Sequence, residues 1–164
     1  MTDLNGLKKQ RVAILGSTGS IGVSTLEVIA KHPQRFEVFA LSAATQVDKI
    51  LAQCACFKPV YAVMASEQHG RQLAQKIEAE GLETIVKYGP EAIEFVASHE
   101  SVDTVMAAIV GAAGLASCLA AARAGKRLLL ANKEALVVGG DFFLQAVGEG
   151  GAKLLPIDSE HSAV

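Results

Sequence analysis

The chain has 164 residues, of which 51% are hydrophobic and 20% are charged. Domains commonly have about 100 to 200 residues, so this is the size and composition of a globular domain and excludes a disordered or collagen-like chain. Fifteen basic and seventeen acidic residues leave a formal net charge of −2, with both signs interspersed along the chain. This balance gives no electrostatic reason to expect a nucleic-acid partner.

The three cysteines do not predict a disulfide framework, because their number is odd and no signal peptide is recognised. A reducing, cytoplasmic compartment is expected. Cys54 and Cys56 have no second cysteine pair elsewhere, so we interpret them as packing residues of a helix rather than as metal ligands.

One uncharged segment, residues 104–122, is long enough to resemble a membrane span, which needs about 18 apolar residues or more. Much of it is alanine and glycine, which gain little on transfer to lipid. Gly111 and Gly114 lie where strand-type residues give way to helix formers. We expect a buried strand, a turn and a helix from about Leu115, and no membrane contact.

Short apolar runs alternate with helical patterns along the whole chain. Strands are predicted at residues 11–15, 36–41, 61–64, 84–86, 102–110, 127–130 and 153–157, and helices at 20–31, 47–58, 66–80, 90–97, 115–124 and 134–148. The last helix is expected to be interrupted at Gly139-Gly140. This pattern predicts an α/β fold, with a doubly wound, mostly parallel, Rossmann-like sheet and helices on both faces.

A glycine-rich segment, Gly16-Ser17-Thr18-Gly19-Ser20-Ile21-Gly22, lies between the first predicted strand and the first predicted helix. A dinucleotide pyrophosphate binds at this position in Rossmann-like folds. Glycines permit a tight turn and close approach of the backbone, and the free amides of a helix N-terminus attract a phosphate. Hydroxyl groups of Ser17, Thr18 and Ser20 are further candidate donors, although the motif alone is also compatible with a simple packing turn.

The end of the second predicted strand bears on the choice between NAD and NADP. A carboxylate there would accept a hydrogen bond from the ribose 2′-hydroxyl of NAD. The segment Ser42-Ala43-Ala44-Thr45-Gln46 has no acid before Asp48, which favours NADP. It also has no basic residue, and Lys49 is the nearest cation.

Polar clusters follow two later strands, at the edge where open α/β sheets bind ligands. Asn132-Lys133-Glu134 follows one strand, and Asp158-Ser159-Glu160 follows another. If strand geometry persists, Asp158 and Glu160 point to the same side, and their oxygens suit a hard cation such as Mg²⁺ or Mn²⁺. Solvated helix and strand ends are the alternative interpretation of both clusters.

Four segments in this order resemble the N-terminal part of the 1-deoxy-D-xylulose 5-phosphate reductoisomerase family, which is NADPH- and metal-dependent and belongs to the non-mevalonate isoprenoid pathway. They are residues 16–22, Val105 to Gly114, Leu130 to Leu136, and Pro156 to His161. The resemblance extends over nearly the whole chain from Arg11 onward. It implies reduction and isomerisation of 1-deoxy-D-xylulose 5-phosphate, a phosphosugar, to 2-C-methyl-D-erythritol 4-phosphate, and a homodimer for the full-length protein.

The resemblance also implies roles for individual residues. The cofactor contacts it implies are Thr18, Gly19, Ser20, Ile21, Gln46, Asn132 and Glu134. The substrate contacts are Lys133, Ser159 and Glu160, and the ligands for Mg²⁺, Mn²⁺ or Co²⁺ are Asp158 and Glu160. The family commonly has Gly, a variable and often basic residue, and Asn where this chain has Ala44-Thr45-Gln46, so the binding of the 2′-phosphate is not explained by the resemblance.

Family members continue beyond this point with a catalytic region, whereas this chain stops at Val164. We therefore expect a cofactor-binding domain at residues 1–150 and the start of the catalytic region at 151–164, with NADPH binding but little or no turnover. A non-catalytic dinucleotide-binding regulatory module is the alternative, distinguished by having no need of Asp158-Ser159-Glu160. A semialdehyde dehydrogenase with a similar loop would need a catalytic cysteine at a strand end, and none of the cysteines is predicted there.

Overall fold

The computed structural model describes residues 8–110, 113–131 and 134–157. The strands in this part of the chain are β1 (Gln10–Leu15), β2 (Phe36–Ala43), β3 (Tyr61–Met64), β4 (Ile85–Tyr88), β5 (Thr104–Ala107), β6 (Arg127–Leu130) and β7 (Lys153–Pro156). The helices are α1 (Ser20–Lys31), α2 (Val47–Phe57), α3 (Glu67–Ala79), α4 (Pro90–Ser98), α5 (Ala113–Arg123) and α6 (Glu134–Gly150). The alternation predicted from the sequence is confirmed. So is the break in the last helix, because Gly140 has a left-handed φ of +49°.

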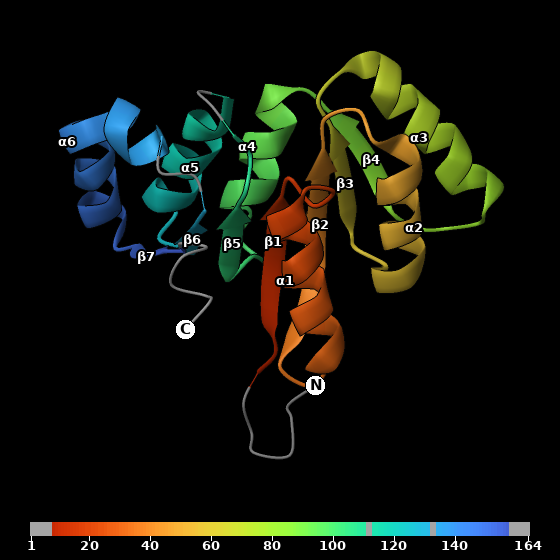
Figure 1. Cartoon of the computed structure of the whole chain (residues 1–164), viewed down its shortest axis with the longest axis horizontal. Coiled ribbons are helices and arrows are strands. Elements are labelled where there is room, and N and C mark those ends of the chain that lie inside the picture. Colours follow the sequence, from red (N-terminus) through yellow and green to blue (C-terminus); the bar gives the residue numbers. More distant parts are fainter. Residues whose placement is uncertain (1–7, 111–112, 132–133, 158–164) are drawn as a thin grey trace.

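All strands belong to one sheet with the order β4-β3-β2-β1-β5-β6-β7, and every neighbouring pair is parallel (Figure 1). The predicted doubly wound parallel sheet is therefore confirmed. Parallel strands need crossover connections, which the helices supply. The strand order reverses at β1: the chain moves outward through β2, β3 and β4 on one side and returns through α4 to β5 on the other.

Two apolar cores lie on opposite faces of the sheet. One packs α1, α2 and α3 against the sheet through residues such as Leu26, Ile50 and Leu73. The other packs α4, α5 and α6 through residues such as Val96 and Phe143. Because both faces are covered, β1 is buried from Val12 to Leu15, as expected for a central parallel strand.

The predicted strand at residues 102–110 is too long. The strand ends at Ala107 because its partner β1 ends at Leu15. The carbonyl of Leu15 is the last acceptor of β1, and it accepts from Ala108 N–H at 2.9 Å. Val110 is 81% exposed. The following helix, α5, has 11 residues, and no helix within the described ranges is long and apolar enough to cross a membrane.

The interpretation of both helix cysteines as packing residues is half right. Cys54 is fully buried beside the sheet, one helical turn after Ile50, but Cys56 is exposed. Residues two positions apart on a helix are separated by about 200° around its axis, so the side chains of Cys54 and Cys56 lie on different faces.

Candidate functional site

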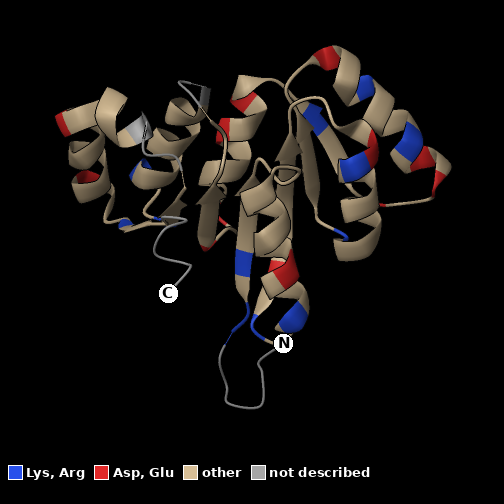
Figure 2. Ribbon diagram, in the orientation of Figure 1, with Lys and Arg blue, Asp and Glu red and all other residues tan. Residues whose placement is uncertain are grey.

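The glycine loop lies at the carboxyl end of β1, where the strand order reverses. Its first glycine touches the segment that follows β5: a Cβ at Gly16 would lie 2.7 Å from Ala108 O. Open α/β sheets bind ligands in the crevice outside such a reversal point. The loop has no charged residue, and its ribbon is tan between β1 and α1 in Figure 2, whereas α3 carries both signs of charge.

Two of the three loop glycines are required by the fold. Gly16 has a φ of +85°, and a Cβ at Gly22 would lie 2.3 Å from Gly16 O and 2.6 Å from the Cα of Ser17. A side chain at Gly22 would therefore push α1 away from β1.

Gly19 is different, because nothing in the chain requires it to be glycine. Its φ is −79°, and a Cβ there would meet only Gly16 O, at 3.8 Å. It precedes the first residue of α1 and is exposed. A side chain would extend into open space beside the start of the helix, which is the space that a bound phosphate needs.

The start of α1 presents unpaired backbone donors. The first bond of the helix runs from Val23 N–H to Gly19 O, at 2.9 Å. In the part of the chain that the structure describes, the N–H groups of Ser20, Ile21 and Gly22 have no acceptor, and the first turn has no acidic side chain. Free amides and the positive end of the helix dipole favour an anion here, so the loop fits the pyrophosphate of a dinucleotide.

Ser17 was expected to add a hydroxyl donor for the phosphate, and this expectation is wrong. The side chain is fully buried, with its hydroxyl 2.7 Å from Gln53 Oε1 and 3.2 Å from Ser42 O. Gln53 Nε2 in turn donates to Ser17 O at 2.9 Å. Ser17 therefore ties the loop to β2 and α2, whereas Thr18 is half-buried and Ser20 is exposed.

Ser42 and Gln53 are positioning residues that the sequence analysis missed. Ser42 Oγ accepts from Gly16 N–H at 3.0 Å, and its carbonyl accepts from Ser17 N–H at 2.8 Å. A usable signal was present for Ser42, since a hydroxyl in an otherwise apolar buried strand needs a hydrogen-bond partner.

The segment that follows β2 is open to solvent. Ala44, Thr45 and Gln46 are exposed, and Gln46 is the N-cap residue of α2 without a side-chain capping bond. The predicted cofactor contact at Gln46 is therefore accessible, and its role stays a prediction.

The remaining predicted site residues lie outside the described ranges: Asn132, Lys133, Asp158, Ser159 and Glu160, and the side chain of Glu134. The structure does describe the residues that come directly before these two segments. Ala131 N–H donates to Ala107 O at 3.1 Å, and Ile157 N–H donates to Leu130 O at 2.8 Å. Ala131 and Ile157, the last described residues before the two polar segments, therefore lie at the carboxyl edge of the sheet, the edge that carries the glycine loop. Among the described residues, no three His, Cys, Asp or Glu side chains are grouped so that they could hold a metal ion, and Asp158 and Glu160 lie outside these residues.

The cysteines are unsuited to nucleophilic catalysis. Burial raises the pKa of Cys54 and of Cys118 to about 11, so both thiols are protonated near neutral pH. Both are buried inside helices, and Cys56, although exposed, also lies within α2 rather than at a strand end. The prediction that no cysteine lies at a strand end is confirmed, so a dehydrogenase with a cysteine nucleophile has no candidate nucleophile here.

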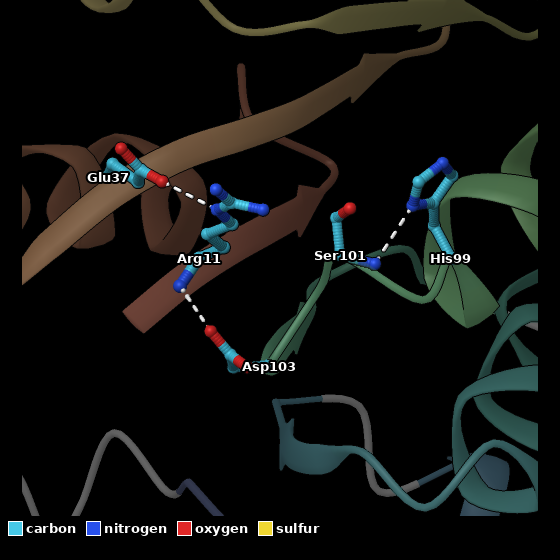
Figure 3. A network of polar contacts seen from close by, with 5 residues as sticks. All are labelled: Arg11, Glu37, His99, Ser101 and Asp103. Carbon is cyan, nitrogen blue, oxygen red and sulfur yellow. Dashed lines mark hydrogen bonds and ion pairs between the residues drawn. The ribbon is translucent and has the colours of Figure 1, made fainter. Parts of the chain in front are cut away.

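The amino edge of the sheet carries a polar network of another kind (Figure 3). Arg11 Nε donates to Glu37 at 2.7 Å, and the Arg11 N–H donates to Asp103 at 2.9 Å. His99 Nδ1 accepts from Ser101 N–H at 3.0 Å, and Lys126 Nζ donates to His99 O at 2.6 Å. These groups join neighbouring strands and loops to one another.

Comparison with known proteins decides the family. The family model described as 1-deoxy-D-xylulose 5-phosphate reductoisomerase matches residues 12–140. The chain belongs to this family. It is 57% identical over 164 residues to the reductoisomerase of Aromatoleum aromaticum and 59% identical over 155 residues to that of Cupriavidus metallidurans. These matches cover 100% and 94% of the chain but only 41% and 40% of the relatives, so the chain spans about two fifths of their length.

Solved reductoisomerases have the same fold. One crystallised with NADPH, fosmidomycin and magnesium has a TM-score of 0.89 and 53% identity, covering 93% of this chain and 37% of its own. The Zymomonas mobilis reductoisomerase in complex with NADPH has a TM-score of 0.88 and 39% identity, covering 94% and 40%. A Bordetella pertussis dehydrogenase with 17% identity and a TM-score of 0.60 shares the fold alone.

Proposed function

We propose that this chain is the NADPH-binding part of a 1-deoxy-D-xylulose 5-phosphate reductoisomerase, which acts in the cytoplasm in non-mevalonate isoprenoid synthesis. The whole enzyme isomerises and reduces its substrate to 2-C-methyl-D-erythritol 4-phosphate. One observation carries the cofactor proposal: Gly19 is open to solvent and unconstrained by the chain, directly beside the free amides of α1. NADPH in solved relatives that match 93% and 94% of this chain supports it.

The chain positions the cofactor and stabilises its negative charge, whereas the redox chemistry belongs to the cofactor. When bound, NADPH supplies the hydride that reduces the aldehyde formed by the isomerisation. The backbone from Thr18 to Ile21 holds the pyrophosphate at the helix N-terminus, and Ser17 stiffens this loop through Gln53. Gln46, Asn132 and Glu134 are the further proposed cofactor contacts.

The substrate and metal contacts are proposed from the chemical types of the side chains in the two polar segments. Carboxylates at Asp158 and Glu160 would hold Mg²⁺, Mn²⁺ or Co²⁺, with further ligands from outside this chain, and hard oxygen donors suit such cations. The ammonium group of Lys133 would balance negative charge on the phosphosugar, which Ser159 and Glu160 also contact. A catalytic region beginning at residues 151–164 and a homodimer of the whole enzyme belong to the same proposal, as does the absence of nucleic-acid and membrane partners.

The test is a fluorescence titration of the 164-residue chain with NADPH, using wild type, Gly19→Val and Gly148→Val. A Cβ at either glycine has no backbone conflict, so both variants should fold. Gly19 is the N-cap residue of α1, where valine is disfavoured, so Gly19→Val should lose about 1 kcal/mol of stability while staying folded. Gly19→Val should bind NADPH roughly a hundredfold more weakly, because its side chain blocks charge-assisted bonds to the phosphates.

The matched control, Gly148→Val on exposed α6, should bind NADPH like wild type. No saturable binding by folded wild type, or equal affinity of the two variants, would contradict the cofactor proposal. Oxidation of NADPH on addition of 1-deoxy-D-xylulose 5-phosphate would contradict the expectation that the isolated chain has little or no turnover.

A further inference from the structure

The recognition of the adenosine 2′-phosphate is unexplained at the position where Rossmann-like folds perform it. This position follows the second strand, where an acid binds the ribose of NAD and a cation accommodates the extra phosphate of NADP. Here the residues after β2 are Ala44, Thr45 and Gln46, which are exposed and uncharged. Any charge that selects between the cofactors has to come from a neighbouring element.

Lys49 in the first turn of α2 supplies a cation at this edge. Its ammonium nitrogen lies 3.4 Å from the carbonyl oxygen of Thr18 in the glycine loop, so the side chain extends from α2 toward the pyrophosphate position. The contact is long, exposed and made to a neutral acceptor. Among the described residues no carboxylate forms an ion pair with Lys49, so its charge is available to a ligand.

The neighbouring acid does not cancel this charge. Asp48 Oδ1 lies 3.2 Å from Lys76 Nζ of α3. Adjacent residues on a helix are about 100° apart, so Asp48 contacts α3 while Lys49 contacts the glycine loop. Lys76 also balances the one acidic side chain in the first turn of α2.

Backbone donors complete the arrangement. Val47 N–H is bonded to Thr45 O and Ile50 N–H to Gln46 O. In the described part of the chain, the N–H groups of Asp48 and Lys49 have no acceptor. A phosphate beside Thr45 would therefore meet free amides together with one ammonium group.

We propose that Lys49 recognises the 2′-phosphate and gives this chain its preference for NADPH over NADH. The inference rests on the proposed function. Lys49 would take the role of the basic residue that is missing at position 45. It requires only rotation of an exposed side chain from the Thr18 carbonyl to the phosphate.

The experiment measures dissociation constants of NADPH, NADH and adenosine 2′,5′-bisphosphate for wild type, Lys49→Met, Lys49→Arg and Lys31→Met. Lys49→Met should weaken NADPH and the bisphosphate about tenfold or more, leave NADH within about twofold, and make NADPH binding less salt-dependent. Lys49→Arg should restore most of the preference for NADPH. Lys31→Met, which removes the same charge at the far end of α1, should change none of the constants.

Folding is checked separately by thermal unfolding. Removing a cation from the first turn of a helix does not destabilise it, so Lys49→Met should unfold at the wild-type temperature or above it. Equal weakening of NADPH and NADH, or no change in either, would overturn the role of Lys49. Failure of wild type to bind any of the three ligands would instead overturn the proposed function.

Discussion

Polar groups at the amino edge of the sheet are hydrogen-bonded within the chain, whereas backbone donors at the carboxyl edge are not. At the amino edge, Arg11 donates to Asp103 and Glu37 (Figure 3). Lys126 at the same edge donates to His99 O. At the carboxyl edge, five amides in the first turns of α1 and α2 have no acceptor within the described chain: those of Ser20, Ile21, Gly22, Asp48 and Lys49. Paired groups stabilise the fold, whereas unpaired donors at an exposed helix start are available to a ligand.

The comparison also separates residues within the glycine loop itself. Among the described residues, no buried side-chain nitrogen or oxygen lacks a partner, and the buried Ser17 follows this rule. Gly19, two residues later, has no structural requirement of its own. Changes at the buried part of the loop should therefore alter stability, and changes at the open part should alter binding.

The largest effect on stability is expected for Gly22→Ala. Its new Cβ would lie 2.3 Å from Gly16 O, a backbone atom that moves only if β1 or α1 moves. We expect a loss of about 2–4 kcal/mol in the free energy of unfolding, measured by urea denaturation. The control Gly148→Ala adds the same methyl group in open space on α6 and should be neutral or stabilising by up to about 1 kcal/mol. Similar stabilities for the two variants would show that the loop is not tightly packed against β1.

Much of the fold was predictable because its signals are local. Apolar runs that begin shortly after a proline or a glycine located strands such as Tyr61–Met64 and Arg127–Leu130 with their observed bounds. The end of β5 was not predictable in this way. The apolar run continues to Val110, and the strand ends at Ala107 because its partner β1 ends at Leu15.

The site was predictable at the level of the loop but not of each side chain. The glycine spacing and its place after the first strand identified the phosphate position. The inward orientation of Ser17 depends on Ser42 and Gln53, which are 25 and 36 residues away in the chain. The contact between Lys49 and Thr18, 31 residues apart, is equally nonlocal. Such pairings follow from the arrangement of β1, β2 and α2, which the sequence pattern alone does not specify.

A smaller effect is expected for Gln53→Leu, which removes the link between α2 and the glycine loop. The substitution leaves Ser17 O and the Ser17 hydroxyl without their amide partner. We expect a loss of about 1–2 kcal/mol in unfolding free energy. A looser loop should also bind NADPH and NADH more weakly by the same factor, unlike the selective effect of Lys49→Met.

The control for this prediction is Gln72→Leu, the same change on the exposed surface of α3. It should leave both stability and cofactor binding at the wild-type level. If Gln53→Leu weakened NADPH alone, Gln53 would be a contact for the 2′-phosphate rather than a support for the loop.

The smallest effect is expected at the amino edge, for Lys126→Met. Burial lowers the pKa of Lys126 from its ordinary value of 10.5, although Asp103 and Glu100 oppose the shift. As pH rises from the lowered pKa to 10.5, the folded state releases this proton before the unfolded state does, so the unfolding free energy gains a contribution that increases with pH. Lys126→Met loses the bond to His99 O, at a cost of about 1 kcal/mol, and lacks this pH-dependent gain. Lys126→Arg stays protonated throughout and should also lack it. Urea denaturation of the three proteins at several alkaline pH values measures the difference, and a wild-type stability that does not rise relative to both variants would show that the amino edge leaves this lysine well solvated.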